Sequence, residues 1–403
     1  MNKAFRHYAV GLTGGIVLFL LAGLALNIVV NPWRVLPARW MAQSLEPYRD
    51  TSEALRTSKA GLVRAHPDCE VVFAGSSRVE IGFNPEHSAL AGRKALNLAF
   101  SGGLILETVP MVRYAMAHEK NLKLVIVGID PGDLADDQDP RRVTDFYSSP
   151  LADEGFSLDR ELRYWVGMPA LKASLSTLRN ALRKKSSANK PLGQSLLTRI
   201  PPDVRTYVQD QRRGFVFDAT EAWALEPKES GIGKVEAFRL LLADLRKAGV
   251  KVLVAFPPMH ALRLINPSDD YPERVAWERD RRILARVCGE VNALPETGPA
   301  VQLWDFMNFA PPMDEPLPAA NAADKGFPDW FDFVHFSARV GDRMLGRMLG
   351  PAGRADPADG FGVDVLKEGI EAHLAAIRES HRKYCESHPE DVAWMRSILN
   401  DKP

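Results

Sequence analysis

Residues 71–85 read VVFAGSSRVEIGFNP, an apolar run followed at once by a glycine, two serines and an arginine. An apolar run this short, without alternation, is typical of a strand buried on both faces of a sheet. The stop at Gly75 indicates a turn, which leaves the polar residues at the edge of that sheet. Because serines also end strands for ordinary turn reasons, this stretch alone leaves the roles of Ser76 and Ser77 open.

The same kind of run recurs along the chain and sets the fold class. The runs are CEVVFAG at 69, which includes the start of the stretch quoted above, ALNLAF at 95, KLVIVGID at 123, VKVLVAF at 250 and VQLWDF at 301. Helical patterns precede the third, fourth and fifth runs, with apolar residues three or four positions apart. This alternation predicts an α/β fold with a mostly parallel five-stranded sheet and helices on both faces.

The pattern also suggests how the chain is divided. We expect a membrane anchor at 1–30, a connector ending in a helix at 31–67, the α/β domain at 68–350 and a helical extension at 351–403. Residues 140–231 interrupt the alternation with one or two helical patterns and a polar tract. We interpret them as a helical insertion, and one arrangement would put it over the mouth of the sheet.

The N-terminus carries the clearest signal for location. Tyr8–Val30 has no charged residue over a length that spans a bilayer as a helix, and Lys3 and Arg6 precede it. Basic residues before a single span place the N-terminus in the cytoplasm and the remaining chain outside. A cleaved signal peptide is the alternative, although its cleavage site would be poorly formed near Ala25–Asn27. We therefore expect a single-pass anchor.

Composition excludes several classes of partner. The 403 residues include 51 basic and 51 acidic side chains, so no global field attracts nucleic acid. The three cysteines, Cys69, Cys288 and Cys385, show no CxxC or Cys/His metal spacing. We expect neither a metal nor a nucleic-acid partner.

Polar residues follow the strands where a parallel sheet binds its ligands, beyond the carboxyl ends. The loops after the runs contain Gly75-Ser76-Ser77-Arg78, Ser101-Gly102-Gly103, Gly128-Ile129-Asp130-Pro131 and Pro257-Pro258-Met259-His260. Asp332 and His335 follow in the segment DWFDFVHFSARVGDRML, before the last helical pattern of the domain. A serine, glycine amides, an aspartate and a histidine thus converge on one rim.

This ordered set resembles the SGNH (GDSL-type) hydrolase superfamily over about Val71–Leu349, excluding the insertion. It is especially similar to the membrane-anchored extracytoplasmic branch that acts in O-acylation of bacterial surface polymers. The resemblance implies a three-layer, flavodoxin-like fold and an inner-membrane protein whose globular part is in the periplasm. It also implies Ser77 as nucleophile, His335 as base and Asp332 as the group that orients the imidazole. The backbone amides of Ser77 and Gly102 would line the oxyanion hole.

The chemistry agrees with these assignments. A serine hydroxyl becomes a good nucleophile when a hydrogen-bonded imidazole removes its proton, and a carboxylate fixes the imidazole tautomer. The spacing Asp-x-x-His allows both side chains to meet within one turn, and the reaction needs no cofactor. Taken singly, the same residues have plain interpretations: the serines as a helix N-cap pair, Asp332 and His335 as a helix start, and Gly102 as a turn.

One position departs from the superfamily pattern. The superfamily commonly has an asparagine after the third strand as a further oxyanion donor, whereas this chain has Asp130, which cannot donate when ionised. The third donor is then missing, or supplied by Asn97 or His260, or Asp130 pairs with Arg78 and holds the loop. The sequence leaves these alternatives open.

Two functions follow as hypotheses. The first is a serine esterase or O-acyltransferase acting on acyl esters, most simply acetyl esters, of a cell-envelope polysaccharide, with a membrane protein as acyl donor in the transfer case. Water or a sugar hydroxyl would attack the same acyl-enzyme, so the sequence does not separate hydrolysis from transfer. The second is a catalytically silent relative that binds polymer or scaffolds a membrane assembly, which Asp130 and the insertion favour.

Overall fold

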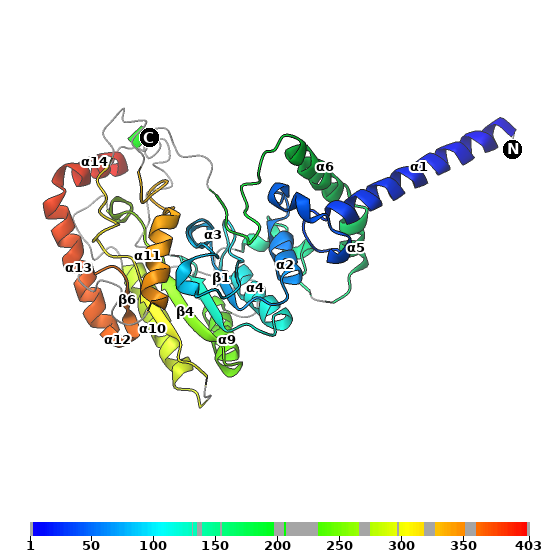
Figure 1. Cartoon of the computed structure of the whole chain (residues 1–403). Coiled ribbons are helices and arrows are strands. Elements are labelled where there is room, and N and C mark those ends of the chain that lie inside the picture. The colour runs from blue at the N-terminus through cyan, green and yellow to red at the C-terminus, as the bar shows by residue number, and fades with distance from the viewer. Residues whose placement is uncertain are drawn as a thin grey trace. The chain divides into compact units, whose positions relative to one another are not determined.

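The structure is a computed structural model that describes residues 3–130, 132–134, 139–153, 155–196, 205–206, 233–265, 275–295, 298–317, 327–350 and 360–400 (Figure 1). Its contacts divide the chain into two compact units. The first contains residues 1–67 and 141–193, and the second contains 68–140 and 194–403. The first unit therefore joins two segments that are far apart in the sequence.

The second unit is built on a six-stranded sheet in the order β2-β1-β3-β4-β5-β6. The strands are β1 Val71–Ala74, β2 Ala95–Asn97, β3 Leu124–Gly128, β4 Lys251–Phe256, β5 Gln302–Asp305 and β6 Val363–Asp364. The first five pair in parallel, and β6 pairs antiparallel with β5. The predicted α/β fold with a mostly parallel sheet is confirmed, and each of the five predicted runs forms a strand.

The sixth strand corrects the predicted strand number. It belongs to the segment that the sequence suggested as a helical extension, and it follows Gly362, whose φ is +81°. A strand of two half-buried residues shows no apolar periodicity, so nothing in its sequence distinguishes it from a loop.

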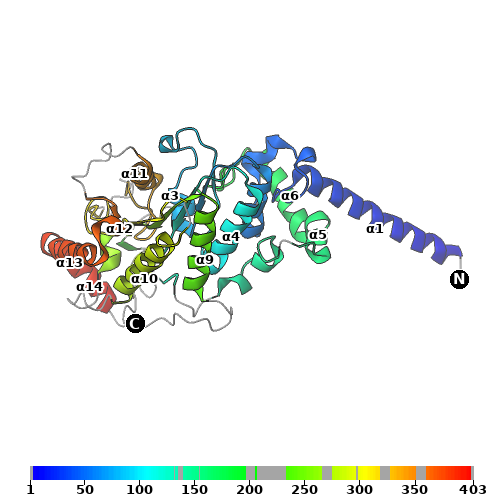
Figure 2. The ribbon, with the colours of Figure 1, turned by 90° about the horizontal axis from the view of Figure 1, so that it is seen from below.

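Helices cover both faces of the sheet. They are α3 Ser77–Gly82, α4 Ile105–His118, α9 Lys234–Lys247, α10 Val275–Asn292 and α11 Ala338–Leu349. Helix α4 contacts α9 and α9 contacts α10, and Figure 2 shows these three as one row, whereas α3 and α11 contact each other. Because helices cover the strands, all residues of β1 and β3 are buried, which explains their continuous apolar sequence.

The C-terminal residues pack onto the sheet unit. Helices α12 Val365–Glu368, α13 Ile370–Ser387 and α14 Pro389–Asn400 follow β6. At the end of β5, the buried carboxylate of Asp305 accepts hydrogen bonds from Arg281 of α10 and from His373 of α13, the latter over 3.0 Å. Burial opposes ionisation of Asp305, but the charge of Arg281 and the bond from His373 lower its pKa to about 2.

The first unit combines the connector with the start of the predicted insertion. Its helices are α1 Lys3–Val30, α2 Leu55–Ala65, α5 Leu158–Trp165 and α6 Met168–Leu182. Its core consists of Trp33, Val35, Leu36, Ala54, Tyr164 and Ala170, taken from both segments. Short 3-10 helices occur in this unit at Ala38–Trp40, Gln43–Tyr48 and Phe146–Ser148, in the second unit at Ser88–Leu90 and Ala261–Leu264, and at the boundary at Pro140–Arg142. Of the predicted insertion, residues 197–204 and 207–231 lie outside the described residues.

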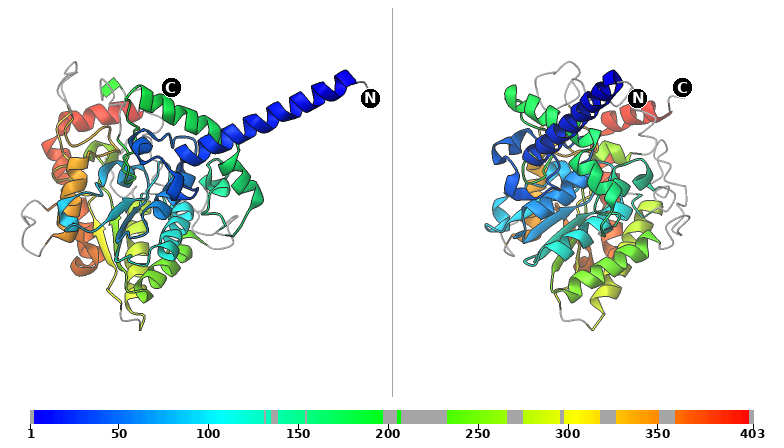
Figure 3. Two further views of the ribbon diagram at one scale, coloured as in Figure 1. Left: turned by 45° about the vertical axis from the view of Figure 1, so that its right-hand side comes forward. Right: turned by 90° about the vertical axis from the view of Figure 1, so that its right-hand side faces the viewer.

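Helix α1 is long and apolar enough to cross a membrane. The apolar segment is Phe5–Val30, which has 26 residues and lies near the N-terminus. No residue in its most apolar part is buried. In Figure 3 only its last turns contact the rest of the first unit. The structure thus contains the predicted single N-terminal apolar helix. A membrane anchor and a signal segment would both form such a helix.

Candidate functional site

A tight turn carries the chain from β1 into α3. Gly75 has φ +141°, and a Cβ at this position would lie 2.7 Å from the carbonyl oxygen of Gly128 on the neighbouring strand. Only glycine meets both conditions, because a side chain would be strained and would collide with backbone. The turn puts Ser76 and Ser77 at the carboxyl edge of the sheet.

The two serines have different surroundings. Ser76 is buried, and its hydroxyl accepts a hydrogen bond from the Arg78 amide at 3.3 Å, as a helix N-cap does. Ser77 is partly exposed, and its Oγ lies 2.9 Å from Nε2 of His335. The N-cap interpretation therefore applies to Ser76, while Ser77 faces the histidine.

The imidazole of His335 is held from its other side by Asp332. His335 Nδ1 lies 2.7 Å from one carboxylate oxygen of Asp332, and the other oxygen accepts the amides of Val334 and His335, each at 2.7 Å. Burial opposes ionisation of Asp332, but the hydrogen bond and charge of His335 lower its pKa below the ordinary value. An ionised Asp332 favours the proton on Nδ1, which leaves the Nε2 lone pair to accept the Ser77 proton.

A closed loop carries Asp332 and His335. The amide of Phe331 donates to the carbonyl of His335 at 2.8 Å, and the amide of Ser337 donates to the carbonyl of Asp329 at 2.8 Å. These bonds fold residues 330–336 back on themselves, so Asp332 and His335 meet three positions apart.

Glycine contacts bring this loop to Ser77. A Cβ on Gly82 of α3 would lie 2.0 Å from the ring of Phe336, and a Cβ on Gly341 of α11 would lie 1.8 Å from the carbonyl oxygen of Gly82. Helices α3 and α11 thus meet backbone to backbone, with the Phe336 ring in the gap. Because Phe336 adjoins His335 and α3 begins at Ser77, this contact sets their separation.

The two amides proposed for the oxyanion hole are unpaired. Within the described residues, the N–H groups of Ser77 and Gly102 donate no hydrogen bond. Gly102 is exposed at φ +68° on the loop after β2, and nothing lies within 4 Å of where its Cβ would be. The amide of Phe100 donates to the carbonyl of Gly75 at 3.1 Å, so this loop is fixed to the turn between β1 and α3. The two amides are therefore available as hydrogen-bond donors, which is what an oxyanion hole requires.

Asp130 pairs with Arg78, which is one of the alternatives that the sequence left open. One oxygen of Asp130 accepts Nε of Arg78 at 2.9 Å and also Nη2, while Nη1 donates to the carbonyl of Pro257 at 3.0 Å. The Arg78 side chain is fully buried. It therefore joins α3 to the loops after β3 and β4, directly behind Ser77.

The other two proposed donors have structural positions instead. The side-chain amide of Asn97 donates to the carbonyls of Val79 and Phe83, both at 2.9 Å, and is buried. The asparagine thus satisfies the end of α3 rather than the rim, which is a correction to its proposed site-lining role.

His260 is likewise buried away from the rim. Its Nε2 donates to the carbonyl of Glu315 at 2.8 Å, its Nδ1 accepts the amide of Leu262 at 3.2 Å, and its ring stacks on Phe333. Burial lowers the pKa of His260 to about 4, so it stays neutral. Since its amide also donates to the carbonyl of Phe333 at 3.1 Å, it supports the loop that carries Asp332.

Roles for Glu80, Arg263 and Asp133, which lie near the site, were not predicted. Ser101 donates to the buried carboxylate of Glu80 at 2.9 Å, which fixes the Gly102 loop to α3 a second time. The guanidinium of Arg263 is buried, and burial together with the charge of Arg78 lowers its pKa to about 10, against the opposing effect of Asp332. The carboxylate of Asp133 accepts the Asp130 amide at 2.8 Å, and burial with the neighbouring Asp130 raises its pKa well above the ordinary value. Proximity of Arg263 to His260 and of Asp133 to Asp130 in sequence was their only signal.

Metal ligands do not gather in the described part of the chain. No group of three or more His, Cys, Asp or Glu side chains there has the arrangement of a metal site.

Comparisons with known proteins identify no family for this chain. No protein-family model and no curated protein matches the chain. Among solved structures, one from Streptococcus pneumonia described as a "putative platelet activating factor" is 10% identical, with a TM-score of 0.30. The match covers 74% of this chain and 90% of that one.

Proposed function

We propose that the chain is a serine esterase or O-acyltransferase of the SGNH type. The observation that carries the proposal is the hydrogen-bonded series Ser77, His335, Asp332, with Oγ–Nε2 at 2.9 Å and Nδ1–Oδ2 at 2.7 Å. The parallel strand order 2-1-3-4-5 supports the finer fold assignment, because it is the doubly wound, flavodoxin-like order.

The chemistry begins with an ester carbonyl above Ser77. Ser77 Oγ attacks the carbonyl carbon while its proton moves to Nε2 of His335, and the carbonyl oxygen takes the negative charge. The free amides of Ser77 and Gly102 stabilise that charge, each such donor being worth roughly 3 kcal/mol of barrier. His335 then returns the proton to the leaving alcohol as the carbon–oxygen bond breaks, which leaves an acyl-enzyme.

The acyl-enzyme decides between the two reactions. Attack by water through the same histidine releases the acid and completes hydrolysis, whereas attack by a sugar hydroxyl completes transfer. We propose acetyl esters of a cell-envelope polysaccharide as substrates, an extracytoplasmic location for the catalytic unit, and a membrane protein as acyl donor in the transfer case. Helix α1 and the resemblance to envelope O-acylation proteins support this setting.

The test measures esterase activity of the full chain in detergent on 4-nitrophenyl acetate. We expect Ser77→Ala to lower kcat/KM by at least about 10³-fold, since removal of a nucleophile leaves only the binding and oxyanion contributions. Ser76→Ala is the matched control and should retain turnover, because its hydroxyl is used as an N-cap. Equal turnover by wild type and Ser77→Ala would refute the serine mechanism.

One observation favours the second hypothesis, a catalytically silent binding or scaffold protein. Asp130 stands where the superfamily has a donor, and its carboxylate is occupied by Arg78. A fluorophosphonate separates the cases, because it labels an activated serine without an acceptor substrate. Failure to label wild type that unfolds cooperatively would favour the silent protein.

A further inference from the structure

The first unit carries exposed apolar side chains beside α1. Phe156 is 81% exposed, Leu158 62% and Leu162 51%, and on α6 Met168 and Leu175 are exposed to a similar degree. Leu158 and Leu162 lie four residues apart on one face of α5, whereas Arg160 and Tyr164, on the opposite face, are buried. Two leucines of α5 thus face outward, next to the exposed side chains of Asp159 and Arg163.

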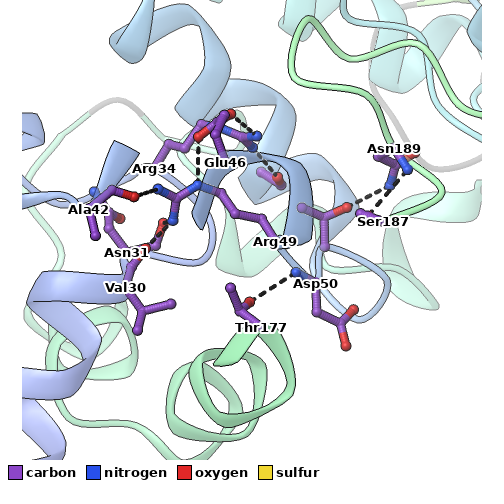
Figure 4. Close-up of polar contacts among 12 residues, drawn as sticks. Val30, Asn31, Arg34, Ala42, Glu46, Arg49, Asp50, Thr177, Ser187 and Asn189 are labelled. Atoms are coloured by element: carbon purple, nitrogen blue, oxygen red, sulfur yellow. Dashed lines mark hydrogen bonds and ion pairs between the residues drawn. The ribbon is translucent and has the colours of Figure 1, made fainter. Parts of the chain in front are cut away.

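Helix α1 is firmly joined to α5 and α6 at its last turns. Asn27 of α1 donates to the carbonyl of Trp165 at 3.1 Å and accepts the hydroxyl of Ser174 at 2.9 Å. Arg49 donates to the carbonyl of Asn31 at 2.8 Å and to that of Val30, so the end of the helix is also held from the connector (Figure 4). The direction and depth of α1 are therefore fixed for this unit.

The covered part of α1 begins close to where the helix would leave a bilayer. Its surface is exposed up to Ala22, and covering begins at Gly23, where a Cβ would lie 3.9 Å from Leu171 of α6. From Tyr8, the first residue after the basic leader, to Ala22 the exposed helix measures about 22 Å at 1.5 Å per residue, which is shorter than the roughly 30 Å of a hydrocarbon core. The residues that pack on α1 from Gly23 onward are therefore within reach of the lipid leaflet.

The apolar residues of α6 lie at the level of Gly23. Met168 and Leu175 are three residues before and four after Leu171, so they share its helix face, which is the face toward α1. Trp40, 48% exposed, lies near the same end of α1, because Ala42 donates to the carbonyl of Val29 at 2.9 Å. Exposed tryptophan beside the end of a span is typical of the interface between lipid and water.

Charge favours an anionic surface. Residues 162–193 contain seven basic and no acidic side chains, in a chain with a net charge of zero. The basic residues are Arg163, Lys172, Arg179, Arg183, Lys184, Lys185 and Lys190. This excess lies in α6 and the residues after it, whereas α5 has two acidic and two basic residues. A basic helix with exposed apolar side chains beside a membrane span combines the two attractions that hold peripheral helices on anionic lipid.

We propose that α5 and the start of α6 rest on the bilayer, with Phe156, Leu158, Leu162, Met168 and Leu175 in the boundary between headgroups and acyl chains. The occupant of this surface is the lipid leaflet that α1 leaves. In this arrangement the first unit sets the tilt of α1 and its depth in the membrane. The proposal does not depend on whether the second unit is an esterase.

The test uses the full chain reconstituted into vesicles of phosphatidylcholine with phosphatidylglycerol. A Cys385→Ser background removes the partly exposed thiol, while Cys69 and Cys288 are buried. A fluorophore is attached at Leu162→Cys, and lipids with a nitroxide near the headgroup serve as quencher. We expect the nitroxide to quench at least about half of the emission of the fluorophore at position 162. The quenched fraction should be smaller in vesicles without anionic lipid.

Two further proteins control the result. A probe at Leu18→Cys, in the exposed part of α1, reports the span itself and should be quenched by deep nitroxides. Phe156→Glu with Leu158→Glu should restore the Leu162 emission while leaving the Leu18 probe quenched, since both side chains are exposed and their exchange leaves the core intact. Quenching at Leu18 without quenching at Leu162 would overturn the proposal. Emission at Leu162 that changes with protein density instead would assign the surface to a second copy, and would overturn it as well.

Discussion

At the scale of single residues, the site depends on which hydrogen bond each polar side chain makes. Of two adjacent serines, one caps α3 and the other meets His335. Asp332 uses both oxygens, one for the ring and one for two backbone amides, so its carboxylate cannot rotate away. The proposed activity therefore depends on an ionised, immobile Asp332.

Asp332→Asn tests this dependence. Asparagine keeps the shape but offers an amide to Nδ1, which favours the imidazole tautomer that cannot accept the Ser77 proton. We expect kcat on an activated ester to fall about 10³- to 10⁴-fold at pH 7 with KM nearly unchanged. Retention of full activity by this variant would mean that Asp332 only shapes the loop.

Asp130→Asn tests the ion pair between Asp130 and Arg78. If Asp130 holds the loops together, the variant leaves the buried Arg78 uncompensated and loses about 3 kcal/mol in the free energy of unfolding. Urea denaturation measures this loss, with fluorophosphonate labelling as the second readout. Faster labelling with unchanged stability would instead mean that asparagine at position 130 supplies an oxyanion donor that the wild type lacks.

At the scale of elements, the contact between α3 and α11 sets the distance between Ser77 and His335. Gly341→Ala would introduce a Cβ 1.8 Å from a backbone oxygen that cannot move aside cheaply. We expect α11 to shift, Ser77 and His335 to separate, and serine labelling to slow strongly. Gly346→Ala is the matched control on the same helix, since nothing lies within 4 Å of its Cβ position. Its helix propensity rises, so labelling should persist and stability should not fall. Equal labelling of both variants would contradict the contact's role.

The carboxylate of Asp305 fixes α10 and α13 to the end of β5. Its pKa of about 2 lies below the ordinary 3.8, so the folded state binds the proton less readily than the unfolded state. The resulting stability, about 2 kcal/mol, is complete above about pH 5 and is lost as the pH falls toward 2. Asp305→Asn should lower the free energy of unfolding at pH 7 and flatten its decrease between pH 5 and 3. An unchanged acid limb in denaturation curves would exclude this linkage.

At the scale of the whole molecule, the sequence predicted what depends on local pattern and missed what depends on distant partners. Buried parallel strands are continuous apolar runs, so five strands and the rim they share could be predicted. Trp33 and Tyr164 pack together across more than a hundred residues, and no local pattern signals that the connector and insertion share a core. Asn97 and His260 had the right chemistry for the rim, but burial decided their roles, and burial at a loop end is not encoded locally.

Membrane topology is the last property that belongs to the whole chain. Lys3 and Arg6 precede the apolar segment, so we expect them to stay in the cytoplasm and both units to lie outside. The chain offers a probe: Lys383 on α13 has a side chain that is 68% exposed, whereas burial raises the pKa of the Cys69 and Cys288 thiols to about 12. With Cys385→Ser as background, a membrane-impermeant maleimide should therefore label Lys383→Cys in intact spheroplasts. The background protein alone should stay unlabelled, and detergent should add little to the labelling of the variant. Labelling that requires lysis would place both units in the cytoplasm, where the acceptor cannot be an envelope polysaccharide, even if Ser77 proves reactive.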